Sequence, residues 1–189
     1  FQKKSKTMSD EEFKNILNQK FNPQEPNKVW VCDFTYIRVC GRYYYLCAII
    51  DLFSRKVIAY KLSNRIDTQL AIDTVYLAVA SRGKSNGIIF HSDRGSQFTS
   101  SKFRKHLDNL NMIQSFSAKG HPYDNAVIEC FFKYLKKEEV NRRSYSSFDD
   151  LNLSLFQYIN GFYNSFRPHS HNNGLSPNDF EQCYFLNFC

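Results

Sequence analysis

The sequence predicts an α/β domain in which a five-stranded mixed sheet is flanked by helices. Runs of β-branched and aromatic residues fill much of the first third of the chain, which is the composition of strands. Later segments alternate between helical spacing of apolar residues and short apolar runs, an order typical of a sheet covered by helices. Apolar residues make up 42% of the 189, so the chain can bury one sizeable core.

Three strands open the predicted sheet. Val29 to Val39 and Tyr43 to Phe53 are mostly apolar or aromatic, and a turn at Gly41 lets them pair as a hairpin. A third strand, Lys56 to Leu62, follows the short turn at Ser54-Arg55. These short connections predict an antiparallel meander.

Helices and strands then alternate. Asp67 or Thr68 can cap a helix that ends at Gly83. The expected elements after it are a buried strand at 88–91, a helix at 99–111 and a strand at 113–116. This order of elements is the one found in ribonuclease-H-like folds.

Two further helices complete the prediction. Asn125 is expected to accept the first free amides of a helix over 126–140. Ser147 with Asp150 forms a capping box at the start of a long helix, which Pro168 ends.

The net charge favours a polyanionic partner. The chain carries 25 Lys and Arg against 18 Asp and Glu, a formal charge of +7, which points to nucleic acid before other partners. Charge alone is weak evidence here, because the basic residues are scattered except at Lys136-Lys137 and Arg142-Arg143. No stretch reaches the roughly 18 apolar residues of a membrane helix, and no signal-peptide core is seen, so we expect no membrane partner and a cytoplasmic location.

The cysteines predict neither a disulfide framework nor a zinc site, because no Cys-x-x-Cys pair occurs among them. They are Cys32, Cys40, Cys47, Cys130, Cys183 and Cys189. We expect buried or inert thiols in a reducing compartment. A metal shared by His169, His171 and Cys183 is a less favoured alternative.

Three carboxylates are candidates for chemistry. Asp33 lies within the first strand, where a charge is costly unless it is paired or binds a cation. Asp93 ends the fourth strand and meets Asp33 if the two strands are neighbours. Glu129 lies early in its helix, on a face shared with Lys133 and Lys136. Such a set suits hard divalent ions, and two magnesium ions about 3.5–4 Å apart would support phosphoryl transfer.

Structural alternatives remain open from these residues alone. Asp33 could be a hydrogen-bonded strand residue, and Asp93 could cap a turn. Glu129 could belong to a solvated helix face with Lys133.

Five blocks of sequence resemble the catalytic core of bacterial insertion-sequence transposases of the Asp-Asp-Glu type, in particular the orfB type of the insertion-sequence-three group. The blocks lie at 30–37, 50–55, 91–98, 120–129 and 158–169, the last with Leu175-Ser176-Pro177. This family shares its core with retroviral integrases and separates its last two acids by 35 residues. Asp93 and Glu129 are also separated by 35 residues, Arg94 to Ile128.

The resemblance implies that Asp33, Asp93 and Glu129 are catalytic and hold two magnesium or manganese ions. It implies nicking at transposon ends, and attack of the freed 3′-hydroxyl on a phosphodiester. The implied partners are the DNA ends, the target DNA and further copies of the chain assembled on DNA. A ribonuclease-H-type nuclease and a catalytically dead DNA-binding remnant are the rival hypotheses.

Other positions carry weaker implications. The candidates for DNA contact are Lys133, Lys136, Asn125, Arg94 and Arg167. Of these, Asn125 is expected to be a helix cap first, and Arg167 is favoured to contact the helix bearing Glu129 rather than phosphate. Asp51 and Arg55 fall in a family block but outside the triad, so a structural role at the hairpin turn is favoured. His91 is left undecided.

We expect three parts along the chain. Residues 1–26 are a lead-in helix, capped by Ser9 with Glu12, and a linker from a missing N-terminal DNA-binding region. Residues 27–145 are the catalytic core, and 146–189 are a helical extension packed on it.

Overall fold

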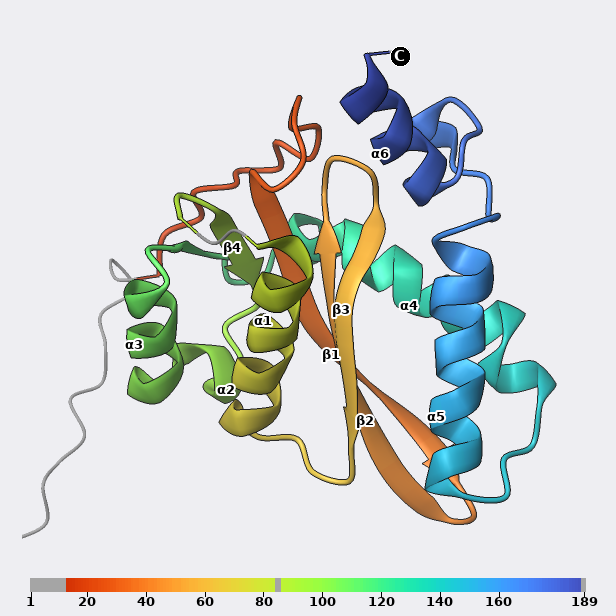
Figure 1. Ribbon diagram of the computed structural model, residues 1–189. Coiled ribbons are helices and arrows are strands. Elements are labelled where there is room, and N and C mark those ends of the chain that lie inside the picture. The colour runs from red at the N-terminus through yellow and green to blue at the C-terminus, as the bar shows by residue number, and fades with distance from the viewer. Residues whose placement is uncertain (1–12, 84–85, 188–189) are drawn as a thin grey trace, which may run out of the picture.

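A mixed five-stranded sheet lies at the centre of the computed structural model, which describes residues 13–83 and 86–187 (Figure 1). The strands are β1 Val29–Val39, β2 Arg42–Asp51, β3 Lys56–Ser63, β4 Ile89–Ser92 and β5 Ile113–Phe116. Their spatial order is β3-β2-β1-β4-β5. The first three pair antiparallel, whereas β4 pairs parallel with both β1 and β5. The predicted fold class and meander are confirmed.

The pairing of β1 sets the geometry of one edge of the sheet. β4 pairs with β1 only through Val29, Trp30 and Val31. β1 continues to Val39, so its second half has β2 on one side and no strand on the other. Because β1 and β4 are parallel, the carboxyl end of β4 lies at this opening, beside the middle of β1.

Helices cover both faces of the sheet (Figure 1). They are α1 Thr68–Arg82, α2 Ser96–Thr99, α3 Ser101–Asn109, α4 Ala126–Glu138, α5 Phe148–Phe156 and α6 Pro177–Leu186. Trp30 and Cys32 of β1 belong to a core shared with α1 and α3, whereas Val31 belongs to a core shared with α4 and α5. Successive strand residues point to opposite faces, so a sheet covered on both sides requires apolar residues at nearly every position.

The predicted helix ends are largely confirmed. Asp67 accepts a hydrogen bond from the Leu70 amide at 2.8 Å, and Gly83 has a φ of 61°, which suits glycine. Ser147 accepts from the Asp150 amide at 3.1 Å. The helix expected at 99–111 begins earlier and breaks at Ser100, whose hydroxyl caps α3.

The lead-in helix is wrong where it can be compared. Ser9 and Glu12 lie outside the described residues, and 13–21 has bends and turns in place of a helix. The amides of Ile16 and Leu17 donate to Ser115 Oγ on β5, so tertiary bonds replace those of a helix. The apolar spacing that resembled a helix serves to bury Leu17 in the core.

The last third of the chain departs from a simple helix. α5 passes into a π-helical segment, Gln157–Tyr163, before the chain reaches Pro168. α6 was not predicted, although Ser176 caps it and Pro177 occupies its first turn, both ordinary start signals. Among the described helices, none combines the length and apolar character needed to cross a bilayer.

All cysteines within the described residues are free thiols. Of the thiols predicted to be buried or inert, Cys32 and Cys47 are buried, with their sulfurs 3.6 Å apart, and Cys40 and Cys130 are exposed. Cys40 lies in the β1–β2 turn, where its sulfur donates to the carbonyls of Tyr145 and Ser146.

Candidate active site

Asp33 and Asp93 lie at the opening between β1 and β4. Asp33 is two residues beyond Val31, the last β1 residue paired with β4, and Asp93 directly follows the end of β4. Each carboxylate is held by one backbone amide: Phe34 N donates to Asp33 Oδ1 at 2.7 Å and Gly95 N to Asp93 Oδ1 at 2.9 Å. The second oxygen of each accepts no hydrogen bond from the described residues.

The loop after Asp93 depends on close packing. A Cβ on Gly95 would lie 3.0 Å from Asp93 Oδ1, so any larger residue would push the carboxylate away. Beyond the loop, Phe98 of α2 stacks on Phe34 with ring centroids 5.1 Å apart. This stack ties the segment that bears Asp93 to the strand that bears Asp33.

Glu129 reaches the same region from α4. The helix buries Ile128, Phe131 and Leu135 against the sheet, which leaves Glu129 and Lys133 exposed on its outer side. Ile128, Phe131 and Leu135 are three and four residues apart and share the buried face, whereas Glu129 and Lys133, four residues apart, share the exposed one.

Burial and the neighbouring carboxylates act on the pKa of Asp33. Burial raises the pKa of Asp33 to about 7; the bond from Phe34 N opposes this rise, and the charges of Asp93 and Glu129 add to it. A half-buried acid beside two like charges is stabilised by a cation, and no Lys or Arg of the described chain forms an ion pair with the three.

The donor set fits a hard divalent ion, because it consists of carboxylate oxygens, and the second oxygens of Asp33 and Asp93 accept no hydrogen bond from the described residues. No group of three or more His, Cys, Asp or Glu in the described ranges is already arranged as a coordination shell. The carboxylates are therefore near one another without having the final ligand geometry. In the alternative set of His169, His171 and Cys183, both ring nitrogens of His171 are engaged within the chain, by Arg55 Nη2 at 3.1 Å and by the Phe53 carbonyl at 3.0 Å.

Asn125 does not cap α4 as expected. It occupies the N-cap position, but its side chain makes no capping bond; its Nδ2 lies 3.5 Å from the Cys32 carbonyl, and its buried Oδ1 has no partner. A short 3-10 turn, Pro122–Asn125, precedes α4 and replaces the side-chain cap.

The basic candidates fall into two groups. Lys133 is exposed, and Lys136 Nζ lies 4.8 Å from the centre of the Tyr36 ring, a cation–π contact that joins α4 to β1. Arg94 instead turns to the chain's own backbone, donating to the carbonyls of Ser117 and Phe13.

Arg167 contacts the helix that bears Glu129, as the structural alternative expected. Its Nη2 lies 2.9 Å from Glu138 Oε1, and its guanidinium stacks 3.9 Å over the Tyr134 ring. Both partners belong to α4. The bond to Glu138 raises the pKa of Arg167 further above its ordinary value.

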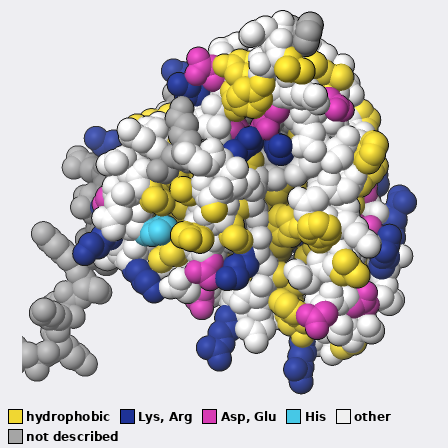
Figure 2. Space-filling view, in the orientation of Figure 1, with side chains coloured by type: hydrophobic (Ala, Val, Ile, Leu, Met, Phe, Trp, Pro, Cys, Tyr) yellow, Lys and Arg dark blue, Asp and Glu magenta, His cyan; other side chains and the backbone are white. Residues whose placement is uncertain are grey.

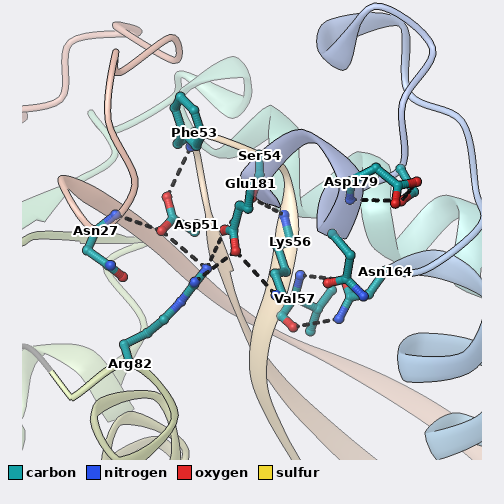
Figure 3. A network of polar contacts seen from close by, with 12 residues as sticks. Asn27, Asp51, Phe53, Ser54, Lys56, Val57, Arg82, Asn164, Asp179 and Glu181 are labelled. Carbon is teal, nitrogen blue, oxygen red and sulfur yellow. Dashed lines mark hydrogen bonds and ion pairs between the residues drawn. The ribbon is translucent and has the colours of Figure 1, made fainter. Parts of the chain in front are cut away.

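Asp51 and Arg55 are structural, as expected for positions outside the triad (Figure 3). Asp51 is fully buried and accepts from the amides of Asn27 and Phe53. Arg82 of α1 lies between Asp51, at 3.5 Å, and Glu181 of α6, at 2.6 Å. Arg55 donates to the carbonyls of Phe21 and Leu52.

His91 is also structural. It is fully buried between β4 and β5, with its ring nitrogens 2.9 Å from Ser115 Oγ and 3.2 Å from Ser117 Oγ. Burial lowers the pKa of His91 to about 4, so the ring is neutral near pH 7.

Two residues near the site were missed by sequence reasoning. Tyr36 supports Lys136, and Asp124 anchors the turn before α4. Neither role has a clear local signal, because Lys136 is 100 residues from Tyr36, and two of the three donors to Asp124, Asn15 and Gln19, are more than 100 residues away in the chain.

Lys and Arg are scattered over one face of the molecule (Figure 2), as they are along the sequence. On the face shown in Figure 2, Lys and Arg side chains are spread around the rim, with Asp and Glu between them. No continuous basic patch is visible on this face.

Comparison with known structures defines the class of fold. The catalytic core of HTLV-2 integrase, solved in complex with magnesium, superimposes with a TM-score of 0.60 at 18% identity, covering 82% of this chain and 97% of that one. The BIV integrase core gives 0.61 at 14% identity, covering 86% and 99%. The fold is that of the ribonuclease-H-like integrase cores.

Sequence comparison narrows this to a family. Residues 23–122 match the model of an integrase core domain, and 129–185 match a second integrase core domain model. The chain belongs to the integrase core domain family, and the resemblance seen in its sequence blocks is confirmed.

Its relatives include transposases of insertion sequences. The transposase of IS904 from Lactococcus lactis is 39% identical over 168 residues, covering 89% of this chain and 66% of the relative. Transposase InsF of IS3A from Escherichia coli is 40% identical over 167 residues, covering 88% and 58%. The chain thus spans roughly three fifths to two thirds of their lengths.

Proposed function

We propose that this chain is the catalytic core of a DNA transposase. In the proposed reaction it nicks DNA at the ends of a mobile element and joins the freed 3′-hydroxyl to a target phosphodiester. The single observation that carries the proposal is the placement of Asp33 and Asp93 at the β1–β4 opening, where each has one oxygen held by a backbone amide and no Lys or Arg of the described residues forms an ion pair with them or with Glu129.

Asp33, Asp93 and Glu129 are proposed to hold two magnesium or manganese ions. Bound metal would activate the attacking oxygen and stabilise the leaving oxygen of the phosphodiester. The chain supplies the ligand oxygens: the bonds from Phe34 N and Gly95 N orient the two aspartates so that one oxygen of each stays available. Glu129 is carried on the packed helix α4, whose residues Ile128, Phe131 and Leu135 are buried.

A DNA-end assay tests the proposal. The chain is incubated with magnesium and labelled DNA carrying element ends, and nicked and joined products are resolved. Asp93→Asn and Glu129→Gln should each reduce both products by about 10³-fold or more, the scale expected when a group central to transition-state stabilisation is lost. Asp73→Asn is the matched control. Asp73 lies on α1 and pairs with Lys61 of β3, a strand that β2 separates from β1.

The products separate the rivals. Hydrolysis of an RNA–DNA hybrid without joining of DNA would support the ribonuclease-H-type alternative. DNA binding without either product, unchanged by Asp93→Asn, would indicate a dead remnant and would overturn the proposal.

DNA contacts and assembly are part of the proposal. Lys133 and Lys136, on the Glu129 side of α4, are the best placed of the five candidates to meet phosphate, whereas Arg94 and Arg167 are engaged within the chain. An intasome neighbour from a simian T-cell lymphotropic virus matches with a TM-score of 0.70 at 19% identity, covering 85% of this chain and 56% of that one, and supports assembly of several copies on DNA. Binding should weaken steeply with salt.

We propose that the chain has three parts: a lead-in at 1–26, the catalytic core at 27–145 and a helical extension at 146–189. Leu151, Leu155 and Ile159 lie in the same core cluster as β1 and α4, which supports an extension packed on the catalytic core.

A further inference from the structure

The segment at 13–22 crosses the edge of the sheet and reaches the surroundings of the active site. The Phe116 amide of β5 donates to the Lys14 carbonyl at 3.0 Å, and Ser115 Oγ accepts from Ile16 and Leu17. Phe13 packs edge-on against Phe116 with ring centroids 5.0 Å apart. The segment is therefore fixed to β5 by backbone bonds and by packing.

Beyond β5 the same segment holds a buried carboxylate, Asp124. Only 2% of this residue is exposed, and its oxygens accept from Asn15 Nδ2 at 2.8 Å, Gln19 Nε2 at 2.9 Å and the Ala118 amide at 2.8 Å. Burial alone would raise the pKa of Asp124; the bonds from Ala118 and Gln19 bring it below its ordinary value. Two of the three donors come from a segment more than 100 residues away in the chain.

Asp124 stands at the start of the helix that carries Glu129. It lies in the 3-10 turn directly before α4, five residues from Glu129. Asn125 makes no side-chain cap and has one long contact, from Nδ2 to the Cys32 carbonyl at 3.5 Å, so the three bonds to the Asp124 carboxylate are the main polar ties between this turn and the rest of the molecule. If Asn15 and Gln19 were lost, the buried charge would keep one donor, and the turn would move to solvate it.

Residues 13–22 also contact Arg94, which is next to Asp93 in the chain. Arg94, next to Asp93, donates to the Phe13 carbonyl at 3.3 Å and lies 5.5 Å over the Phe13 ring. One short segment thus contacts the immediate surroundings of both Asp93 and Glu129.

We propose that residues 13–22 position the active site, and that Asn15 and Gln19 are positioning residues that act on Glu129 through Asp124. Neither side chain touches substrate in this role. The inference rests on the proposed function for its catalytic consequence, while the coupling between the segment and the turn before α4 can be tested without activity.

The test compares Asn15→Ala/Gln19→Ala with Gln24→Ala. The exposed side-chain amide of Gln24 donates to the nearby Asn22 carbonyl. Gln24→Ala therefore removes a side-chain amide without removing a donor to Asp124. Hydrogen exchange should show loss of protection at 118–128 in the double variant and none in the control. In the DNA-end assay kcat should fall about 10- to 100-fold, the cost of a misplacement on the ångström scale, with KM changed less than twofold.

An exchange of partners guards against simple unfolding. Asn15→Asp alone places a second carboxylate beside that of Asp124. Asn15→Asp/Asp124→Asn exchanges the two groups, so that the amide at 124 can donate to the carboxylate at 15. The combined variant should recover kcat and exchange protection relative to Asn15→Asp. Unchanged protection at 118–128 in the Asn15→Ala/Gln19→Ala variant overturns the inference, even if the chain proves inactive on every DNA; unchanged kcat in an active chain overturns it equally.

Discussion

Two acidic clusters lie near the first half of β1, and they differ in the source of their positive charge. Asp51 pairs with Trp30 near the start of β1, and Asp33 lies three residues further along the strand. Asp51 and Glu181 are buried with Arg82 between them, and backbone amides and Ser54 satisfy further oxygens (Figure 3). Asp33, in the other cluster, is near the like charges of Asp93 and Glu129, and none of the three forms an ion pair with a Lys or Arg of the described residues. The first cluster has its counter-charge within the chain, whereas we propose that the second takes a cation from outside.

The largest effect is expected from removing the internal cation. Arg82→Ala would leave Asp51 buried without its cation and Glu181 with Lys56 alone, so the free energy of unfolding should fall by about 3–5 kcal/mol. Urea unfolding measures it. Arg65→Ala, an exposed arginine, should change this free energy by less than about 0.5 kcal/mol. Equal effects of the two substitutions would show that the Asp51 cluster is not held by its ion pairs.

The second effect is expected from adding the external cation. Manganese or magnesium at 100 times its Kd should raise the free energy of unfolding by about 2.7 kcal/mol, because it binds the folded chain alone. Asp33→Asn should abolish this gain, and EDTA should reverse it. Asp51→Asn should lower stability but keep the metal response, since its cluster already has Arg82. A metal response that survives in Asp33→Asn would place the ion elsewhere.

The sequence predicted one cluster far better than the other. The 35-residue interval and the apolar strands before Asp33 and Asp93 place the triad, because strand ends and a helix start are local properties. The role of Asp51 could be assigned only as structural, because Arg82 and Glu181 lie on α1 and α6, far along the chain. The failed helix at 13–21 has the same cause, since its backbone bonds go to β5.

A smaller effect should appear in the pH dependence of stability. The pKa of Asp33 is raised to about 7, so folding favours the protonated acid, and the metal-free chain should lose this stability as pH rises from about 4 to 7. Asp33→Asn should remove that part of the slope, measured by urea unfolding in EDTA. Burial also raises the pKa of Asp51, to about 6, so a slope of the same sign should persist. An identical slope in the unmodified chain and in Asp33→Asn would mean that folding does not raise the pKa of Asp33.

The smallest effect separates the two cations of the Asp51 cluster. Lys56 Nζ lies 3.2 Å from Glu181, but 28% of its side chain is exposed, against 10% for Arg82. Water already screens the lysine, and Glu181 keeps Arg82 and Ser54 when the lysine is lost, so Lys56→Ala should cost about 0.2–1 kcal/mol. In Arg82→Ala the remaining lysine is the only cation near Glu181 within the described chain. Adding Lys56→Ala to that variant should then cost more than it does alone, a coupling that a double-mutant cycle in urea measures. If the losses of unfolding free energy caused by Arg82→Ala and Lys56→Ala simply add, the two cations do not substitute for one another at Glu181. The buried arginine would then be the group that frees this cluster from a need for an outside ion.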